Sequence, residues 1–274
     1  MKKVSLILAV ILALSFTFGA VAEEKTTYAL GVQGAYTEYW NPVIEALKEE
    51  GITLELVEFT DYSQPNRALA DKEIDINAFQ HYKYLAYEMD TLGYDLTVVG
   101  DTIIAPLGMY SLKIDELAKI EKGMTIAIPN DASNGGRALK LLEAAGFLKM
   151  DPEKGFLCEK ADILENALEL DILEADAAQL PSLLPDVDAA IINGGNAFSN
   201  GYGIEDAILT ETLDSLENSP YINVLVCRTE DKDNLLFARI IELLHTDEEA
   251  QLLFDLYSGT IIPAWGGTAQ AGAN

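Results

Sequence analysis

The stretch that decides the fold runs from residue 124 to residue 137 and reads Met124-Thr125-Ile126-Ala127-Ile128-Pro129-Asn130-Asp131-Ala132-Ser133-Asn134-Gly135-Gly136-Arg137. Its apolar start predicts a strand over 124–128, and the amphipathic segment 133–145, which Gly146 closes, predicts a helix. A turn rich in Asn, Asp and Ser joins the two. A strand that runs directly into a helix is the repeating unit of α/β folds.

The same alternation continues outward in both directions and predicts an α/β fold with largely parallel sheets. The predicted strands are 28–32, 53–59, 74–79, 96–99, 188–192 and 221–228. The predicted helices are 39–50, 64–70, 81–92, 175–184, which Pro181 interrupts, 233–244 and 247–257. Two apolar runs, 103–112 and 221–228, are interpreted as crossovers between two lobes. We therefore expect residues 23–111 and 222–265 to form lobe 1 and residues 112–221 to form lobe 2.

Both chain ends carry features that lie outside these lobes. Lys2 and Lys3 precede an apolar run over 4–18, and Ala20-Val21-Ala22 offers small residues at the positions that a signal peptidase recognises. We expect a cleaved signal peptide over 1–22. The alternative, a membrane anchor, is disfavoured because the run is shorter than the roughly 20 residues of a spanning helix. The small, polar tail 266–274 is predicted to be disordered.

Composition excludes several classes of function. The chain carries 45 acidic and 18 basic residues in 274, a net charge of −27, and loss of the two leader lysines would make it −29. Such a surface repels nucleic acid and anionic lipid. With only two histidines, we expect neither a histidine-rich metal site nor a cofactor. Cys158 and Cys227 could form a disulfide or remain two buried thiols.

Arg137 is the most informative charged residue. A helix start exposes backbone N–H groups and a partial positive charge, so a cation in the first turns is unfavourable. This placement suggests that an anion arrives from outside and is held by the guanidinium together with the N–H groups. The alternative is that Arg137 pairs with a neighbouring acid.

Three further segments also follow predicted strands: 59–66, 77–84 and 191–196. The segment 77–84 crowds three aromatic residues with His81, which suits an apolar pocket with polar tips, although ordinary core packing is the alternative. A catalytic role for His81 has little support, because no nucleophile motif accompanies it. Ligands of open α/β sheets bind beyond the carboxyl ends of strands. The four segments therefore predict one shared site between the lobes.

Taken together, the segments resemble the NlpA/MetQ family of substrate-binding proteins of methionine ABC importers. The order and spacing of the matching runs hold over residues 28–263. They are Val57-Glu58-Phe59-Thr60-Asp61-Tyr62 with Gln64-Pro65-Asn66, then Phe79-Gln80-His81, Ala127-Ile128-Pro129-Asn130-Asp131, Ala178-Gln179-Leu180-Pro181, Ile192-Asn193-Gly194 and Asn218-Ser219-Pro220-Tyr221.

The resemblance implies a two-lobed periplasmic-binding-protein fold with a hinge of two crossovers. It implies that Arg137 clamps the carboxylate of an amino acid and that Asn193 and Asn223 hold the carboxylate and the ammonium group. The residues that would surround the ligand's side chain are Tyr62, Phe79, His81 and Tyr84.

The implied function is capture of L-methionine, without catalysis, by a monomer that delivers it to an ABC-transporter permease and its ATPase. Two alternatives stay open. The same fold could bind another apolar amino acid or a methionyl dipeptide, or the chain could be an exported small-acid dehydratase, which would need a general acid or base in the cleft.

The sequence departs from the family pattern in three places. Many members are lipoproteins with a cysteine at the first mature position, where this chain has Glu23, so we expect a periplasmic protein with no lipid anchor at its N-terminus. The run Asn193-Gly194-Gly195-Asn196 carries one glycine more than the commonest version. The loop 33–38 carries Tyr36 where small or polar residues are usual.

Overall fold

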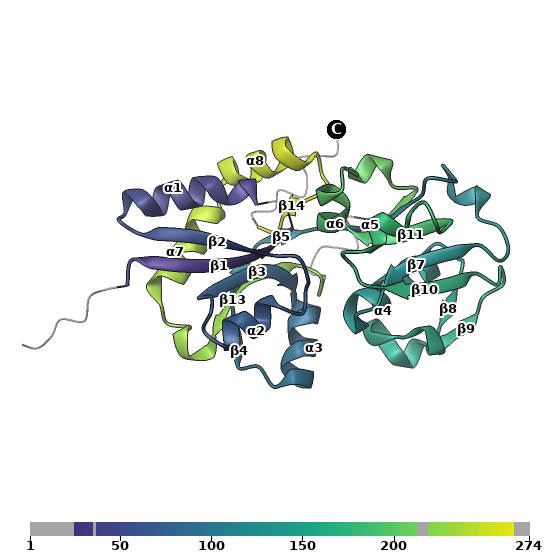
Figure 1. Ribbon diagram of the computed structural model, residues 1–274, viewed down its shortest axis with the longest axis horizontal. Helices are drawn as coiled ribbons and strands as arrows, with labels where there is room; N and C mark the ends of the chain where they lie inside the picture. Colours follow the sequence, from purple (N-terminus) through teal and green to yellow (C-terminus); the bar gives the residue numbers. More distant parts are fainter. Residues whose placement is uncertain (1–24, 35–36, 213–218, 266–274) are drawn as a thin grey trace, which may run out of the picture.

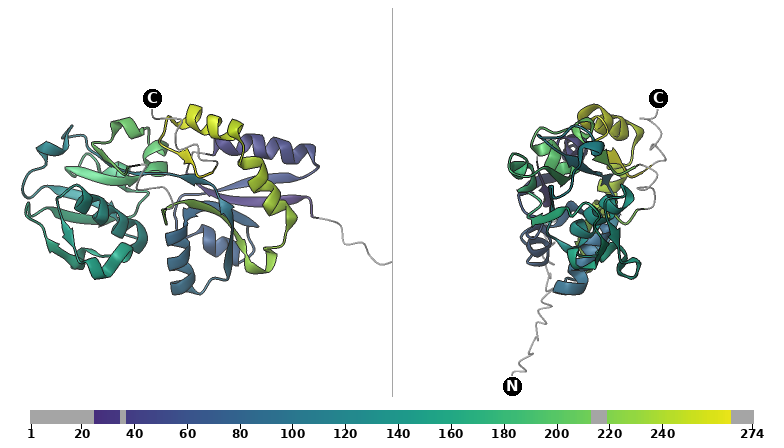
Figure 2. Two further views of the ribbon diagram at one scale, coloured as in Figure 1. Left: turned by 180° about the vertical axis from the view of Figure 1, so that it is seen from behind. Right: turned by 90° about the vertical axis from the view of Figure 1, so that its right-hand side faces the viewer.

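A computed structural model describes residues 25–34, 37–212 and 219–265. The protein consists of two α/β lobes that lie side by side, each built on a five-stranded sheet (Figure 1). Seen from behind, the two lobes are joined near the middle of the molecule (Figure 2). The predicted two-lobed α/β fold is confirmed.

The first lobe has the strand order β2-β1-β3-β13-β4. Its strands are β1 (Thr27–Gln33), β2 (Thr53–Phe59), β3 (Ile76–His81), β4 (Leu96–Asp101) and β13 (Asn223–Arg228). Strand β1 pairs in parallel with β2 and β3, whereas β13 runs antiparallel to β3 and β4. The carboxyl ends of β1, β2 and β3 therefore meet at one edge, which faces the second lobe (Figure 1).

Helices cover both faces of this sheet. On one face, α1 (Asn41–Glu49), α7 (Leu235–Leu244) and α8 (Asp247–Tyr257) enclose a core that includes Leu30, Trp40 and Phe237. On the other face, α2 (Pro65–Ala70) and α3 (Tyr82–Leu92) pack over Leu69, Leu85 and Val224. Each helix buries the apolar stripe that its sequence period predicts.

The second lobe has the strand order β10-β7-β11-β6-β12. Its strands are β6 (Leu107–Tyr110), β7 (Thr125–Pro129), β10 (Asp171–Ala175), β11 (Ala189–Asn193) and β12 (Leu209–Thr210). Strand β7 is parallel to both of its neighbours, and β6 is antiparallel to β11 and β12. Its helices are α4 (Ala132–Ala144), α5 (Leu180–Leu183) and α6 (Gly194–Ser199).

Short elements complete the described chain. A small hairpin joins β8 (Lys149–Met150) to β9 (Ile163–Glu165), and β5 (Ile103–Ile104) pairs with β14 (Ile262–Pro263). The 3₁₀ turns are η1 (Glu38–Trp40), η2 (Leu117–Lys119), η3 (Pro152–Leu157), η4 (Lys160–Asp162), η5 (Ile204–Asp206) and η7 (Thr229–Asp231).

The chain passes from the first sheet to the second between Asp101 and Leu107 and returns between Thr210 and Asn223. Within the predicted second crossover, residues 223–228 form an internal strand of the first sheet. Strand β6 already belongs to the second sheet, although we placed the start of lobe 2 at residue 112. The predicted lobe boundaries stay a prediction.

Two expectations about secondary structure are wrong. The segment 175–184 is not one helix: β10 ends at Ala175, and only the single turn α5 follows. Residues 177–179 form a turn, and Pro181 lies in the first turn of α5, where a proline is tolerated, so no single helix extends through the segment. The sheets are also mixed rather than largely parallel, because each one contains antiparallel strands.

Cys158 and Cys227 are both free and buried, and they belong to the cores of different lobes. The disulfide that the sequence left open is therefore not formed. Within the described ranges, no helix has the length and apolar character needed to cross a membrane. The predicted signal peptide and the predicted disordered tail lie outside the described residues.

Candidate functional site

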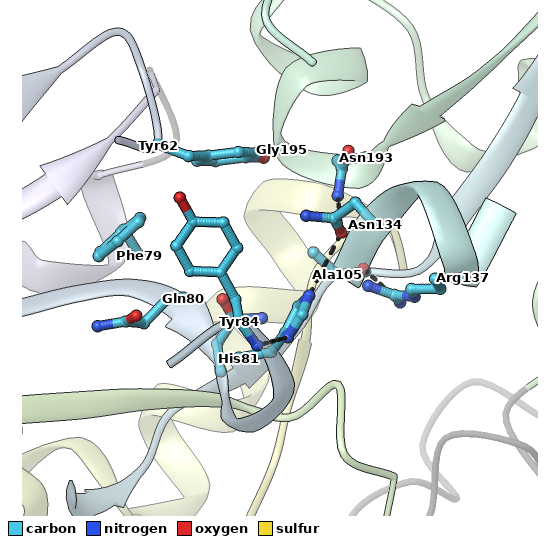
Figure 3. Close-up of a pocket in the computed structure, with 11 residues that line it drawn as sticks. Tyr62, Phe79, Gln80, His81, Tyr84, Ala105, Asn134, Arg137, Asn193 and Gly195 are labelled. Carbon is cyan, nitrogen blue, oxygen red and sulfur yellow. Dashed lines mark hydrogen bonds between the residues drawn. The ribbon is translucent and has the colours of Figure 1, made fainter. Parts of the chain in front are cut away.

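All seven residues predicted for the site line one pocket between the lobes: Tyr62, Phe79, His81, Tyr84, Arg137, Asn193 and Asn223. Gln80, Ala105, Asn134 and Gly195 complete the lining (Figure 3). The pocket encloses about 390 Å³ free of protein atoms, open solvent at its mouth included. The roles of the seven residues toward a ligand stay predictions.

One wall of the pocket is aromatic and belongs to the first lobe. The rings of Tyr62, Phe79 and Tyr84 contact one another, with centroids 5.9–6.2 Å apart. Phe79 lies in β3, Tyr84 in the first turn of α3, and Tyr62 follows β2, so the sheet edge brings them together. The Tyr84 hydroxyl donates to Glu88 Oε1 at 3.0 Å, which fixes the ring. The result is an apolar surface with the aromatic faces and edges that suit a flexible side chain.

His81 connects the aromatic wall to the other lobe. It is the last residue of β3 and caps α3, because its Nδ1 accepts the backbone N–H of Tyr84 at 3.0 Å. The ring proton is therefore on Nε2, which donates to Asn134 Oδ1 at 3.3 Å. Burial first, and the nearby Arg137 charge second, lower the pKa of His81 to about 3. His81 is thus a neutral hydrogen-bond donor at neutral pH.

The opposite wall comes from the start of α4 and the end of β11. Asp131 caps α4 and accepts from both the backbone N–H and the side-chain amide of Asn134 at 2.9 and 3.1 Å. These bonds orient Asn134 so that its Oδ1 accepts from Asn193 Nδ2 at 2.8 Å. Asn193 Oδ1 is buried and has no hydrogen-bond partner among the described residues. A buried acceptor without a donor is costly, so this oxygen is a place for a donor from a ligand.

Arg137 lies at the inner end of the pocket and is 2% exposed. Its Nε and Nη2 atoms bond to Glu211 Oε1 and Oε2 at 2.8 and 2.5 Å, and Nη2 also donates to Ala105 O at 3.2 Å. The guanidinium lies 4.3 Å from the centre of the Tyr221 ring. The alternative interpretation, pairing with an acid, is therefore borne out, but the acid is 74 residues away in the chain. The same guanidinium still lines the pocket.

Glycines allow backbone segments to approach closely beside the site. A Cβ atom on Gly136 would lie 2.4 Å from the carbonyl oxygen of Phe156, and one on Gly194 would lie 2.9 Å from that of Pro106. The glycine before Arg137 thus permits η3 to pack on α4, in addition to weakening the helix. Gly194 lets the start of α6 rest on the segment that crosses between the lobes.

Two further hydrogen bonds join the lobes on the far side of the aromatic wall. Gln33 Nε2 donates to Asn196 Oδ1 at 3.2 Å, and Asn196 Nδ2 donates to the Tyr62 hydroxyl at 3.3 Å. Together with the bond between His81 and Asn134, they hold the structure in a closed arrangement.

Sequence reasoning missed three residues that shape the site: Asn134, Glu211 and Tyr221. Asn134 was part of the quoted segment, and its position three residues after the helix cap Asp131 was a usable signal. Tyr221 is the last residue of the run 218–221, which resembles the NlpA/MetQ family. Nothing in the sequence around Glu211 marks it as the partner of Arg137.

Comparison with known protein families identifies the family of this chain. A family model described as NlpA lipoprotein matches residues 30–265. The chain belongs to the NlpA lipoprotein family. The resemblance found in the sequence motifs is therefore confirmed.

Relatives within the NlpA lipoprotein family cover nearly the whole chain. Outer membrane lipoprotein 2 of Mannheimia haemolytica is 37% identical, over 90% of this chain and 89% of its own length. The probable D-methionine-binding lipoprotein MetQ of Pasteurella multocida is 38% identical, over 89% and 87%. A nutrient-binding protein of Burkholderia cenocepacia, solved with methionine bound, superimposes with a TM-score of 0.82 at 36% identity, covering 87% of this chain and 100% of its own.

One prediction is contradicted by these comparisons. We expected a periplasmic protein without a lipid anchor because Glu23 stands where a lipidated cysteine would be. The family is described as one of lipoproteins, and the relatives in Mannheimia and Pasteurella are named lipoproteins. The prediction used a few residues of the leader, which lie outside the described residues, whereas the family evidence spans both lobes.

Proposed function

We propose that this protein is the substrate-binding protein of an ABC importer and that it captures methionine between its lobes. The observation that carries the proposal is the composition of the pocket. A buried guanidinium and an acceptor without a partner, Arg137 and Asn193 Oδ1, lie opposite an aromatic wall. This arrangement complements an α-amino acid with a flexible apolar side chain.

The charged groups of the ligand find counterparts in the pocket. An amino acid carries a carboxylate and an ammonium group at neutral pH, and burying both is costly unless each is paired. In the proposed complex Arg137 binds the carboxylate, and Asn193 and Asn223 bind the carboxylate and the ammonium group. These three residues come from both lobes, so a ligand that contacts all of them favours the closed state.

The aromatic wall accounts for the side-chain preference. Tyr62, Phe79 and Tyr84 surround the space beyond His81 (Figure 3). A thioether sulfur next to aromatic rings gains about 0.3–1.5 kcal/mol over an ordinary aliphatic contact. We therefore propose that methionine binds more tightly than norleucine or leucine. We propose that the L-isomer binds more tightly than the D-isomer. Because the Pasteurella relative is named for the D-isomer, the binding experiment measures both isomers.

The proposal includes the transport machinery and a monomeric receptor. Membership of the family and the two-lobed architecture support delivery to a permease and its ATPase. A dehydratase on this fold is the weaker candidate, because no Ser, Cys, Asp or Glu is among the residues that line the pocket and His81 is held neutral. Mass spectrometry after incubation with candidate amino acids would detect turnover.

Isothermal titration calorimetry of the purified protein tests the proposal. L-methionine should bind at one site per chain, more tightly than D-methionine, L-norleucine and L-leucine. Arg137→Ala should weaken binding by roughly 30-fold to several thousand-fold, because loss of one partner of a buried charge pair costs about 2–5 kcal/mol. Arg137→Lys should restore binding only in part, because Lys lacks the planar fork.

A matched control is Arg239→Ala, which removes a guanidinium that pairs with Glu50 at 2.7 Å on the surface of the first lobe. This control should bind L-methionine as the wild type does. Binding of L-methionine by Arg137→Ala at wild-type affinity would show that Arg137 is not the carboxylate site. Tighter binding of a methionyl dipeptide than of methionine would favour the dipeptide alternative.

A further inference from the structure

Glu211 lies beside the pocket with its side chain 10% exposed, but it does not line the pocket. We infer that Glu211 makes the site selective for a zwitterion over an anion that has the same side chain, because it neutralises Arg137. The inference rests on the proposed function, since it concerns the charge of the ligand that the same pocket accepts. Glu211 is a positioning residue in this role and acts through Arg137.

Glu211 and Arg137 form an ion pair that is largely shielded from solvent. The side chain of Glu211 is 10% exposed and that of Arg137 is 2% exposed. The carboxylate of Glu211 accepts hydrogen bonds from Nε and Nη2 on one side of the guanidinium. Its Oε2 also accepts the backbone N–H of Leu107 at 2.8 Å. Ala105 O takes a further hydrogen of Nη2. Both Ala105 and Leu107 belong to the segment that crosses between the lobes.

The edge of the guanidinium that Glu211 does not contact is the one available to a ligand. Among the described residues, no hydrogen bond is formed by Nη1 of Arg137. The Tyr221 ring covers one face of the guanidinium at 4.3 Å and limits its rotation. A carboxylate can therefore approach Nη1 in the guanidinium plane, while the charge of the guanidinium is already balanced from the other edge.

Charge balance then determines which ligands fit. Among the described residues that line the pocket, Arg137 is the one with a full charge, because His81 is neutral. Glu211 balances this charge, so the Arg137–Glu211 pair that meets the carboxylate has a formal charge of zero. A zwitterion leaves it at zero. A carboxylic acid without the amino group leaves a net negative charge in a buried site, which is costly.

The competing interpretation is that Glu211 only holds the fold together. Affinity for methionine alone does not separate the two roles, because a misplaced Arg137 would weaken every ligand. The ratio of two affinities does separate them. The two ligands are L-methionine and 4-(methylthio)butanoate, which is methionine without its amino group.

The experiment measures both dissociation constants by calorimetry for the wild type, for Glu211→Gln and for Glu165→Gln. Glu165 pairs with Lys149 at 2.6 Å on the exposed β8–β9 hairpin, so its substitution removes the same charge away from the cleft. The wild type should prefer L-methionine by at least about 100-fold. Glu211→Gln should reduce that preference by at least about tenfold, and Glu165→Gln should leave it unchanged.

An unchanged preference in a folded Glu211→Gln protein would overturn the inference and assign Glu211 a structural role only. Whether or not Glu211→Gln folds, as judged by its circular-dichroism melting curve, the wild type offers a second way to refute the inference. Equal affinity of the wild type for both ligands would overturn the inference. Failure of the wild type to bind L-methionine would instead refute the proposed function, and the same ratio would be measured with whichever zwitterionic amino acid binds. Failure of every zwitterion to bind would overturn both.

Discussion

Acidification should favour the open state of the pocket, because it protonates His81. In the closed structure, burial and the Arg137 charge lower the pKa of His81 to about 3. When the lobes separate, water reaches His81 and the effect of the Arg137 charge weakens, so the pKa moves toward its ordinary value of about 6.5, although the bond to Asn134, which raises the pKa, is lost. Because the closed state holds fewer protons than the open state, protons compete with closure. Ligand affinity should be full above about pH 6.5 and should fall as the pH drops below that value.

The two pKa values set the size of the effect. At pH 5.0, a histidine with a pKa of 6.5 is about 97% protonated, whereas one with a pKa of 3 is about 99% neutral. Closure then costs about 2 kcal/mol, which corresponds to an affinity loss of about 30-fold relative to pH 7.5. This figure is a ceiling, since partial burial of His81 in the open lobe would reduce it. The charges of methionine itself do not change in this range.

Calorimetry with L-methionine at pH 7.5, 6.0 and 5.0 measures this dependence. His81→Gln should bind more weakly at pH 7.5 and should lose most of the pH dependence. The matched control is His245→Gln, since His245 is the only other histidine in the chain and bonds to Asp101 O away from the pocket. This control should retain the wild-type dependence. Equal wild-type affinity at pH 7.5 and 5.0 would refute the reasoning.

Three further predictions concern stability, thiols and closure. Burial and the Glu248 charge raise the pKa of Glu249 to about 7, so folding stability should fall as the pH rises from about 4.5 to 7, by about 1–3 kcal/mol. Thermal melts should show that Glu249→Gln removes this loss and that Glu248→Gln, on the exposed side, retains most of it, because burial is the larger cause. Burial raises the pKa of Cys227 to about 11 and also raises that of Cys158, so both thiols should resist a disulfide reagent at pH 8 until the protein is denatured; rapid native labelling would contradict this. Small-angle scattering should show a smaller radius of gyration with L-methionine, and an unchanged profile at saturation would count against a hinge.

The sequence predicted the elements well where the local pattern and the tertiary contacts agree. Strand β2 (Thr53–Phe59) and helix α8 (Asp247–Tyr257) have the predicted bounds, because each has a regular apolar period and clear end signals. The strand β10 was missed, because its pairing with β7 is a long-range contact that overrides the helical composition of the residues around it.

The sequence predicted residues that line the pocket but not the contacts between them. The four segments meet in one pocket because two follow parallel strands of the first sheet, two follow parallel strands of the second, and the pocket lies between the two lobes. The contacts inside it depend on how the lobes approach. Arg137 meets Glu211 across 74 residues, and His81 meets Asn134 across 53 residues, and no local period encodes either pair. Such contacts belong to the tertiary structure alone.

Native mass spectrometry of freshly purified protein tests the central claim most directly. The account predicts that the protein carries one amino acid with the mass of methionine, or takes up one equivalent when L-methionine is added to protein refolded without ligand. A spectrum that shows only the free chain after addition of L-methionine, or a bound ligand of a different mass that methionine does not displace, would contradict it.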